Sequence, residues 1–302
     1  MHIPDGFLSP AVWATLDLVS VPAVGLLARK AQRDLEDRKI PLLGVMGAFV
    51  FAAQMINFPV GPGTTGHLVG GTLLAVTLGP AAAAVVMTAI LAIQAFVFQD
   101  GGIVVLGANV FNMAIASVLA GYLPYRLWAG SGWRSAAIFA GGVLSVLTSA
   151  CLALAQLLIS GVPMPRRLML VSLGLFLVSG LIEGAVTLAA VRAIERLNPV
   201  WIRSPKDSGS RVLGAVAIAA VTLVAGGVLI ASAAPDGIWS LVGKLGLTAQ
   251  TAPWLHAPLA DYQVNGLESA WLRKATAGLF GLVLVYVACF LTGKFIARQR
   301  SI

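Results

Sequence analysis

Apolar segments dominate the chain, and short polar or Gly/Pro-rich stretches separate them. A helix needs about 20 apolar residues to cross the hydrocarbon core of a bilayer. Eight segments have about that length, and they cover approximately residues 8–28, 40–58, 80–98, 103–123, 135–159, 168–190, 212–233 and 271–292. A ninth, residues 68–78, is too short to cross unaided and ends at Gly79-Pro80. The pattern predicts an all-α integral membrane protein with nine helical segments.

One polar connection is long enough to divide the chain. Residues 192–211 contain two X-Pro steps and a run rich in Ser, Lys and Asp, which is typical of a linker. We therefore predict a seven-helix bundle over residues 1–200, a linker over 201–211, and a second region over 212–302. The second region would consist of two further transmembrane helices that hold a polar excursion at about 234–270.

Composition agrees with the membrane assignment and excludes a soluble domain. The chain is 58% hydrophobic and only 11% charged, whereas soluble domains carry about 25% charged residues. The net charge of +8 does not require a nucleic-acid partner, because Lys and Arg collect in the cytoplasmic loops of membrane proteins.

The positions of these basic residues also predict the orientation. With the N-terminus outside, fifteen of the 20 fall in cytoplasmic segments and five outside, which satisfies the positive-inside rule. The C-terminus is then cytoplasmic. The N-terminus and the Gly/Pro-rich segment 59–67, which we expect to be a loop, share the outer face.

The first two residues offer an unusual set of nitrogen atoms. No Lys or Arg precedes Arg29, so the charged start of a secretory signal is missing, and we expect Met1 and His2 to remain in the mature protein. The Met1 amine, the deprotonated His2 amide and His2 Nδ1 can bind one ion through a five-membered and a six-membered ring. His67, at the same face, would supply a fourth nitrogen. Square-planar nitrogen sites suit Cu(II) and Ni(II), with Co(II) possible.

A structural interpretation of these histidines stays open at this point. His2 can be an incidental terminal residue and His67 an interfacial one, because a single histidine is often structural. His256, the third histidine of the chain, lies in the polar excursion and is interpreted as a surface residue.

Several polar side chains lie within or beside the predicted spans. Asn57, Gln99 and Asp100 are near the outer mouth and could hydrogen-bond the imidazoles of a metal site, as groups around metal ligands do. Hydrogen bonding between helices is the alternative for each. Polar residues inside the spans should face the bundle interior; they include Asp17, Gln54, Gln94, Asn109, Asn112, Gln156 and Glu183.

Residues 1–10, MHIPDGFLSP, resemble the signature opening of the CbiM/NikM family, and residues 61–67, GPGTTGH, resemble its second motif. These proteins are the substrate-binding membrane subunits (S components) of energy-coupling-factor (ECF) transporters, ABC-type systems for cobalt and nickel. The resemblance covers about residues 1–200. It implies that Ni(II) or Co(II) is bound by the Met1 amine, the His2 amide and imidazole, and the His67 imidazole. It also implies partners, namely a transmembrane coupling subunit and ATPase subunits.

The second region resembles a segment known as PDGLE, a two-span accessory piece that is fused to or encoded beside such subunits. The match rests on Pro235-Asp236-Gly237, with Ile238 and Trp239 where the pattern has Leu and Glu. The resemblance implies a part in metal loading. Whether the excursion is a lid or loading arm, or only a spacer, stays open, because long loops can be either.

Missing motifs limit the chemistry of the chain itself. It contains neither the GxxxxGK[ST] phosphate loop nor the HExxH zinc motif, so we expect no enzyme activity and no organic cofactor. We predict that the chain captures nickel or cobalt at the extracytoplasmic face for uptake across a bacterial inner membrane. Of the two metals we favour nickel. The alternative is a membrane metal sensor or scaffold that uses the same site without transport.

Overall fold

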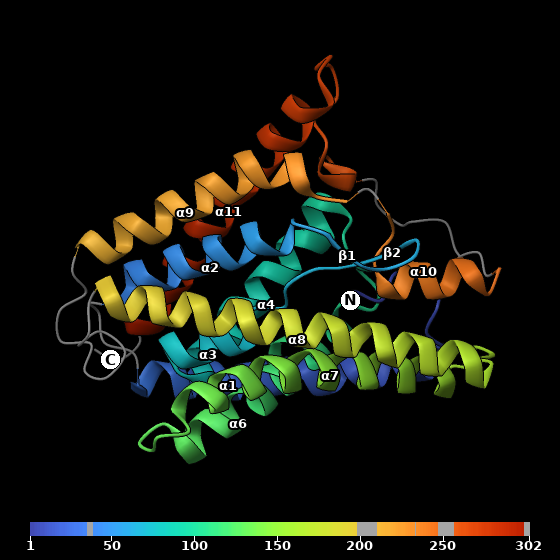
Figure 1. Cartoon of the computed structure of the whole chain (residues 1–302), viewed down its shortest axis with the longest axis horizontal. Helices are drawn as coiled ribbons and strands as arrows, with labels where there is room; N and C mark the ends of the chain where they lie inside the picture. The colour runs from blue at the N-terminus through green and yellow to red at the C-terminus, as the bar shows by residue number, and fades with distance from the viewer. Residues whose placement is uncertain (35–38, 198–209, 233, 247–256, 299–302) are drawn as a thin grey trace.

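The computed structural model describes residues 1–34, 39–197, 210–232, 234–246 and 257–298, and within these ranges it is almost wholly helical (Figure 1). The described residues up to 197 contain α1 (Pro10–Asp34), α2 (Ile40–Gln54), α3 (Gly71–Leu78), α4 (Pro80–Ile93), α5 (Leu106–Asn109), α6 (Ser117–Trp128), α7 (Arg134–Ile159) and α8 (Arg166–Leu197). Wide π-helical turns, η2 (Gln94–Phe98) and η3 (Val110–Ala116), continue α4 and join α5 to α6. The remaining helices are α9 (Ser210–Ile230), α10 (Gly237–Lys244), the short η4 (Ala260–Tyr262) and α11 (Ala270–Arg298).

The predicted fold class is confirmed. Among the described residues, seven helical runs are long and apolar enough to cross a membrane, and α2 is a shorter apolar helix. Each predicted span corresponds to a helix, and the short ninth segment is α3, which has eight residues. At about 1.5 Å per residue, α3 is roughly 12 Å long and does not cross a bilayer. The chain is a multi-pass α-helical membrane protein.

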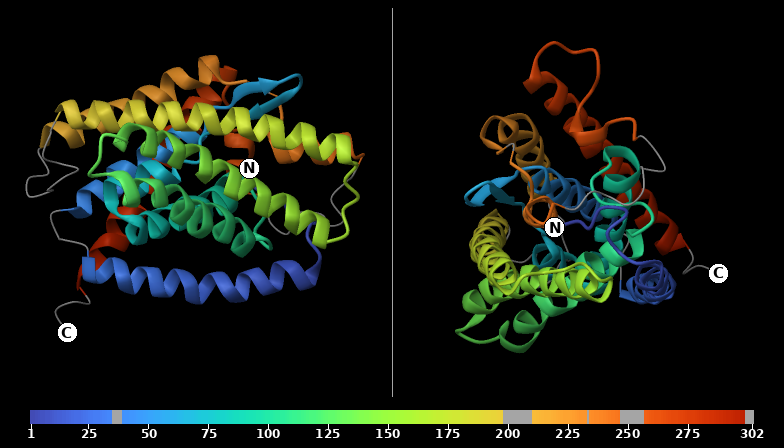
Figure 2. Two further views of the ribbon diagram at one scale, coloured as in Figure 1. Left: turned by 60° about the horizontal axis from the view of Figure 1, so that its bottom comes forward. Right: turned by 90° about the vertical axis from the view of Figure 1, so that its right-hand side faces the viewer.

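The long helices lie side by side with their ends at two common faces (Figures 1 and 2). Helices α1, α8 and α11 end at the left of Figure 1, where α2 and α9 begin. The N-terminus and α10 lie towards the other end. The end-on view in Figure 2 shows the N-terminus enclosed among the helices, and the side chains of Met1 and His2 are buried.

The segment predicted as a loop at 59–67 differs from that expectation. It forms an antiparallel hairpin of β1 (Phe58–Gly61) and β2 (Thr64–Gly66), with Phe58 opposite Gly66. Helix α2 consequently ends at Gln54 rather than near residue 58. Thr65 also pairs with Asp236, which lies just before α10. The hairpin therefore connects the front part of the chain to the second region.

Helices α9 and α11 of the second region pack against α2. Gly44 and Gly47 of α2 allow this approach, because a Cβ atom at either would lie 2.8 Å from the side chain of Tyr286 or Cys289 of α11. The predicted linker at 201–211 lies almost wholly outside the described residues, so the domain boundary stays a prediction.

Candidate metal centre

The N-terminal tail is held by its backbone at Ile3. The Ile3 N–H donates to Asn109 Oδ1 at 2.8 Å, and Asn109 Nδ2 donates to the Ile3 carbonyl at 3.0 Å. The Gly102 N–H donates to the same carbonyl at 3.0 Å. Because the third residue is fixed in this way, the two residues before it are directed into the bundle.

Asp5 forms a second anchor just ahead of α5. Its carboxylate accepts hydrogen bonds from three consecutive backbone amides, those of Ile103, Val104 and Val105, at 3.0, 2.9 and 3.2 Å. Gly102 is needed for this approach, since a Cβ atom there would lie 2.2 Å from Asp5 Oδ1. Charge-assisted bonds of this kind are stronger than neutral ones, so the tail is pinned on both sides of Pro4.

His67 leaves the hairpin into a buried segment that α8 holds in place. The Glu183 carboxylate accepts from the Val69 and Gly70 amides, each at 2.8 Å. His67 Nδ1 lies 2.9 Å from the Leu68 carbonyl. A carbonyl only accepts, so Nδ1 carries the proton and Nε2 keeps its lone pair. A hydrogen bond at one ring nitrogen commonly sets the other as a metal ligand in this way.

The surroundings of His67 keep its imidazole neutral. Burial, followed by the charges of the Met1 ammonium and His2, lowers the pKa of His67 to about 3. The carboxylates of Asp236 and Asp100 act in the opposite direction but do not offset this. At neutral pH the Nε2 lone pair is therefore available to a cation.

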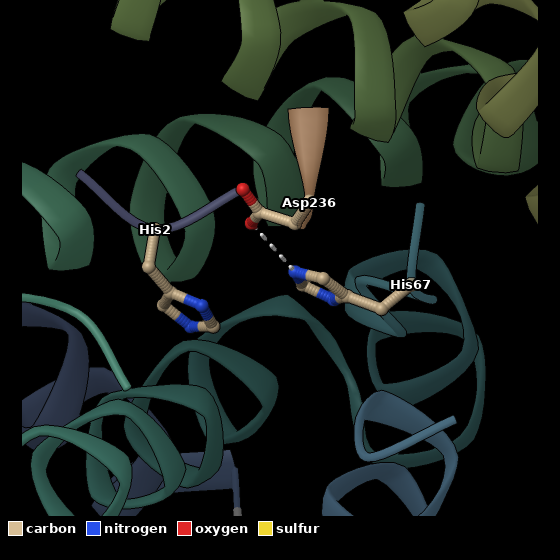
Figure 3. A group of neighbouring side chains, drawn as sticks. All are labelled: His2, His67 and Asp236. Carbon is tan, nitrogen blue, oxygen red and sulfur yellow. Dashed lines mark ion pairs between the residues drawn. The ribbon is translucent and has the colours of Figure 1, made fainter. Parts of the chain in front are cut away.

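The terminal amine and the two imidazoles converge, and a carboxylate from the second region joins them. Figure 3 shows the two imidazoles with this carboxylate, Asp236. The Met1 amine contacts His67 Nε2 and lies 2.7 Å from Asp236 Oδ2. The rings of His2 and His67 are nearly parallel, at 11°, with centroids 5.3 Å apart. His2, His67 and Asp236 each offer one ligand atom, and these atoms all lie within 4.8 Å of one another.

His2 is oriented by a chain of amide side chains. Its Nε2 lies 3.2 Å from Gln94 Oε1, while Gln94 Nε2 donates to Gln54 Oε1 at 2.8 Å. Gln54 Nε2 in turn donates to the Val69 carbonyl at 2.7 Å. The direction of these bonds makes His2 Nε2 the donor to Gln94.

His2 Nδ1 is left with an unused bonding direction. It lies 3.1 Å from Asp100 Oδ1, within ion-pair distance. This buried nitrogen nevertheless has no partner with hydrogen-bond geometry among the residues that the structure describes. Nδ1 is the ring nitrogen through which an N-terminal chelate would close, so the unused direction fits a metal ion.

The three predicted polar neighbours of the imidazoles are placed differently. Asp100 contacts His2 and accepts a 2.6 Å hydrogen bond from the Tyr262 hydroxyl. Burial raises the pKa of Asp100, but the charge of His2 outweighs it and holds that pKa well below its usual range. Gln99 Oε1 accepts from the Ala257 amide at 3.3 Å, and the Asn57 carbonyl accepts from Ser232 at 2.8 Å. These contacts of Gln99 and Asn57 lead away from the imidazoles.

Asp236 is a site residue that sequence reasoning did not identify. Its Oδ1 caps α10 by accepting from the Trp239 amide at 2.9 Å, and its Oδ2 meets the Met1 amine. Burial raises the pKa of Asp236, but the Met1 ammonium is the main cause that lowers this pKa, and the net shift is downward. Pro235-Asp236-Gly237 repeats the motif Pro4-Asp5-Gly6. That repetition could have drawn attention to Asp236, although not to its contact with Met1.

A cavity of about 450 Å³ adjoins the cluster on the side of the second region. His67, Asp100 and Asp236 line it, together with Tyr262, Asp261 and Lys274. The cluster is therefore buried but borders a polar space.

These features define a multi-pass membrane protein with a buried group of nitrogen and oxygen atoms that could hold a metal ion. Comparison with known proteins identifies its family. Residues 2–201 match the CbiM family, described as the cobalt uptake substrate-specific transmembrane region. A fused nickel transport protein NikMN of Rhodobacter capsulatus is 29% identical over 99% of each chain. A cobalt transport protein CbiM of Acetoanaerobium sticklandii is 36% identical over 52% of this chain and 67% of its own.

A crystal structure described as that of a transition metal transporter is also similar. It shares 31% sequence identity with a TM-score of 0.61, over 69% of this chain and 100% of its own. The chain belongs to the CbiM/NikM family, in the fused form that carries a second region. This is a family of metal transport proteins rather than of enzymes.

Proposed function

We propose that this chain is the substrate-binding membrane subunit of an ECF-type transporter for nickel or cobalt. The ion would be held by the Met1 amine, the His2 amide and Nδ1, and His67 Nε2. One observation carries the proposal: the Met1 amine meets the lone pair of His67 beside a buried His2 Nδ1. Within the described part of the chain, this Nδ1 has Asp100 at ion-pair distance but no partner with hydrogen-bond geometry.

The chemistry of these donors favours a late transition metal. Four nitrogen donors in one plane suit Ni(II), Cu(II) or Co(II), whereas Zn(II) prefers a tetrahedron and Mg(II) or Ca(II) prefers oxygen. Imidazoles and an amine bind such ions through lone pairs, so the Met1 ammonium and any protonated imidazole would release their protons to solvent when the ion binds. His67 is fixed in the tautomer that presents a lone pair. Nickel is the favoured cargo, because a relative that matches the whole length of the chain is named for nickel transport.

The proposed direction is uptake across a cytoplasmic (inner) membrane. The excess of basic residues at one end of the helices supports an extracytoplasmic N-terminus and a cytoplasmic C-terminus. The metal site then faces the outside. Since the sequence contains no phosphate-loop motif, energy would come from separate ATPase subunits through a transmembrane coupling subunit.

Accumulation of radioactive nickel and cobalt tests this function in cells that express the chain with its coupling and ATPase subunits. We expect uptake to require the chain and to be lost in His67→Ala. His256→Ala, which removes the one histidine that is not part of the proposed site, is the matched control and should transport normally. Uptake that is unchanged when the chain is deleted would contradict transport. Metal binding by the purified chain without any accumulation would indicate a sensor or scaffold instead.

A further inference from the structure

Asp236 differs from the proposed nitrogen ligands in where it comes from and in how it is exposed. It belongs to the second region, whereas Met1, His2 and His67 belong to the first 200 residues. Its side chain is 11% exposed, against 3% for the side chain of Met1, 2% for His2 and 5% for His67. It also lines the 450 Å³ cavity. His67 lines the same cavity, so an ion in the cavity would meet the carboxylate and the imidazole together.

The distances around Asp236 suit a shared ion. Two donors that bind one ion at about 2.1 Å lie roughly 3 Å apart when adjacent and roughly 4 Å apart when opposite. Asp236 Oδ2 is 2.7 Å from the Met1 amine and 3.8 Å from His67 Nε2. Oxygen and nitrogen ligands at these separations could hold one ion with little movement of the backbone.

The two oxygens of this carboxylate have separate roles. Oδ1 caps α10, while Oδ2 faces the terminal amine and His67. Thr65 fixes the segment just before Asp236, because its N–H donates to the Pro235 carbonyl at 2.9 Å and its hydroxyl to the Ala234 carbonyl at 3.0 Å. Thr65 and His67 lie on the same stretch of chain, so the carboxylate and the imidazole are held in register.

We infer that Asp236 is an entry ligand: it binds the incoming divalent cation from the cavity, together with His67, before the ion reaches the full set of nitrogens. A hydrated divalent ion is attracted to an anionic oxygen, and a charge at the mouth of a site raises association rates. The inference rests on the proposed function and gives the second region a direct part in metal capture.

Stopped-flow binding of Ni(II) to the purified full-length chain tests this inference. We expect Asp236→Asn to lower the association rate constant about ten-fold or more, with the dissociation rate constant changed less than about two-fold on the same reasoning. Asparagine caps helices as well as aspartate does, so α10 should keep its start. Asp236→Glu, which restores the charge, should recover most of the rate.

Asp261→Asn is the matched control, because it removes one charge from the same cavity without touching the cluster. It should bind nickel at the rate of the unaltered chain. An association rate in Asp236→Asn equal to that of the unaltered chain would overturn the inference. A faster rate would also overturn it, since Asp236 would then block the site. If His67→Ala binds nickel normally, the proposed function itself fails, whatever Asp236 does.

Discussion

At the scale of single residues, each imidazole uses one nitrogen for orientation and presents the other. His67 donates from Nδ1 to the Leu68 carbonyl, and His2 donates from Nε2 to Gln94. The orienting nitrogen is Nδ1 in His67 and Nε2 in His2, and the proposed chelate requires this difference. A ring that starts at the terminal amine and amide can only close through His2 Nδ1, whereas His67 reaches the amine through Nε2.

Gln94 should therefore matter for metal binding although it is not proposed as a ligand. Gln94→Leu removes the acceptor that holds His2 Nε2, and loss of such a partner typically costs about 10–100-fold in metal affinity. Titration of the purified chain with Ni(II) measures the effect. Gln156→Leu is the control, since Gln156 pairs with Asn112 in a separate buried amide pair. Equal losses of affinity in both variants would contradict a specific role for Gln94.

At the scale of elements, α8 positions the site from a distance. Glu183 of α8 holds the backbone after His67, so the position of α8 against α7 affects the position of this proposed ligand. The two helices approach closely where a Cβ atom at Gly184 would lie 2.6 Å from the Phe139 carbonyl oxygen.

Gly184→Ala should separate α7 from α8 and destabilise the protein. Overpacking of this kind costs about 1–3 kcal/mol, and thermal unfolding in detergent measures it. Gly174→Ala is the control on the same helix, where an added Cβ atom meets nothing within 4 Å. The control should be neutral or stabilising by up to about 1 kcal/mol, because alanine is the better helix former. A loss of the same size in both variants would refute the packing argument.

Most elements could be predicted from the sequence, because their signal is local. An apolar run of about 20 residues is the usual signal of a transmembrane helix, so all the long helices were predicted. Gly79-Pro80 marked the break between α3 and α4. The hairpin at 58–66 was not predicted, because its Gly/Pro-rich composition is typical of a loop. Its extended backbone depends on contacts with residues far away in the sequence, such as the bond from Thr65 to Pro235.

The candidate site was predictable only in part, because only some of its residues are close together in the sequence. Met1 and His2 are adjacent in sequence, and charge counting brought His67 to their face. The interaction of Asp236 with the terminal amine spans 235 residues, and no local pattern encodes it. Whether Gln99 and Asn57 act on the imidazoles stays a prediction, although their hydrogen bonds lead elsewhere.

At the scale of the whole molecule, the second region is packed into the bundle rather than attached beside it. Helices α9 and α11 bury Val224, Val285 and Cys289, and Tyr262 stacks on Phe98 with ring centroids 4.6 Å apart. Asp236 and Tyr262 thus bring described parts of the excursion into contact with Met1 and Phe98.

This packing predicts that the two predicted regions associate without their linker. Residues 1–200 and 212–302, expressed together as separate chains, should copurify and bind Ni(II), because the interface does not depend on the connection. Affinity purification through a tag on the shorter piece, followed by metal titration, checks this. Failure to copurify, with each piece inserted in the membrane, would show that the connection is required.

We propose that an unblocked N-terminus, His2 and His67 form one metal site, and the amine is the part of this site that is easiest to disrupt. Met1 is 4% exposed and its amine contacts His67. One residue added before Met1 would turn this amine into an amide and displace the chelate while leaving every side chain in place. A chain with one residue added after Ile302 is the control.

The decisive measurement is Ni(II) affinity of the N-terminally extended chain, with retention of the extra residue verified by mass spectrometry and unfolding followed by heating. The expected result is that metal binding is lost while the thermal unfolding transition is kept. Nickel binding at full affinity with the extension retained would contradict it.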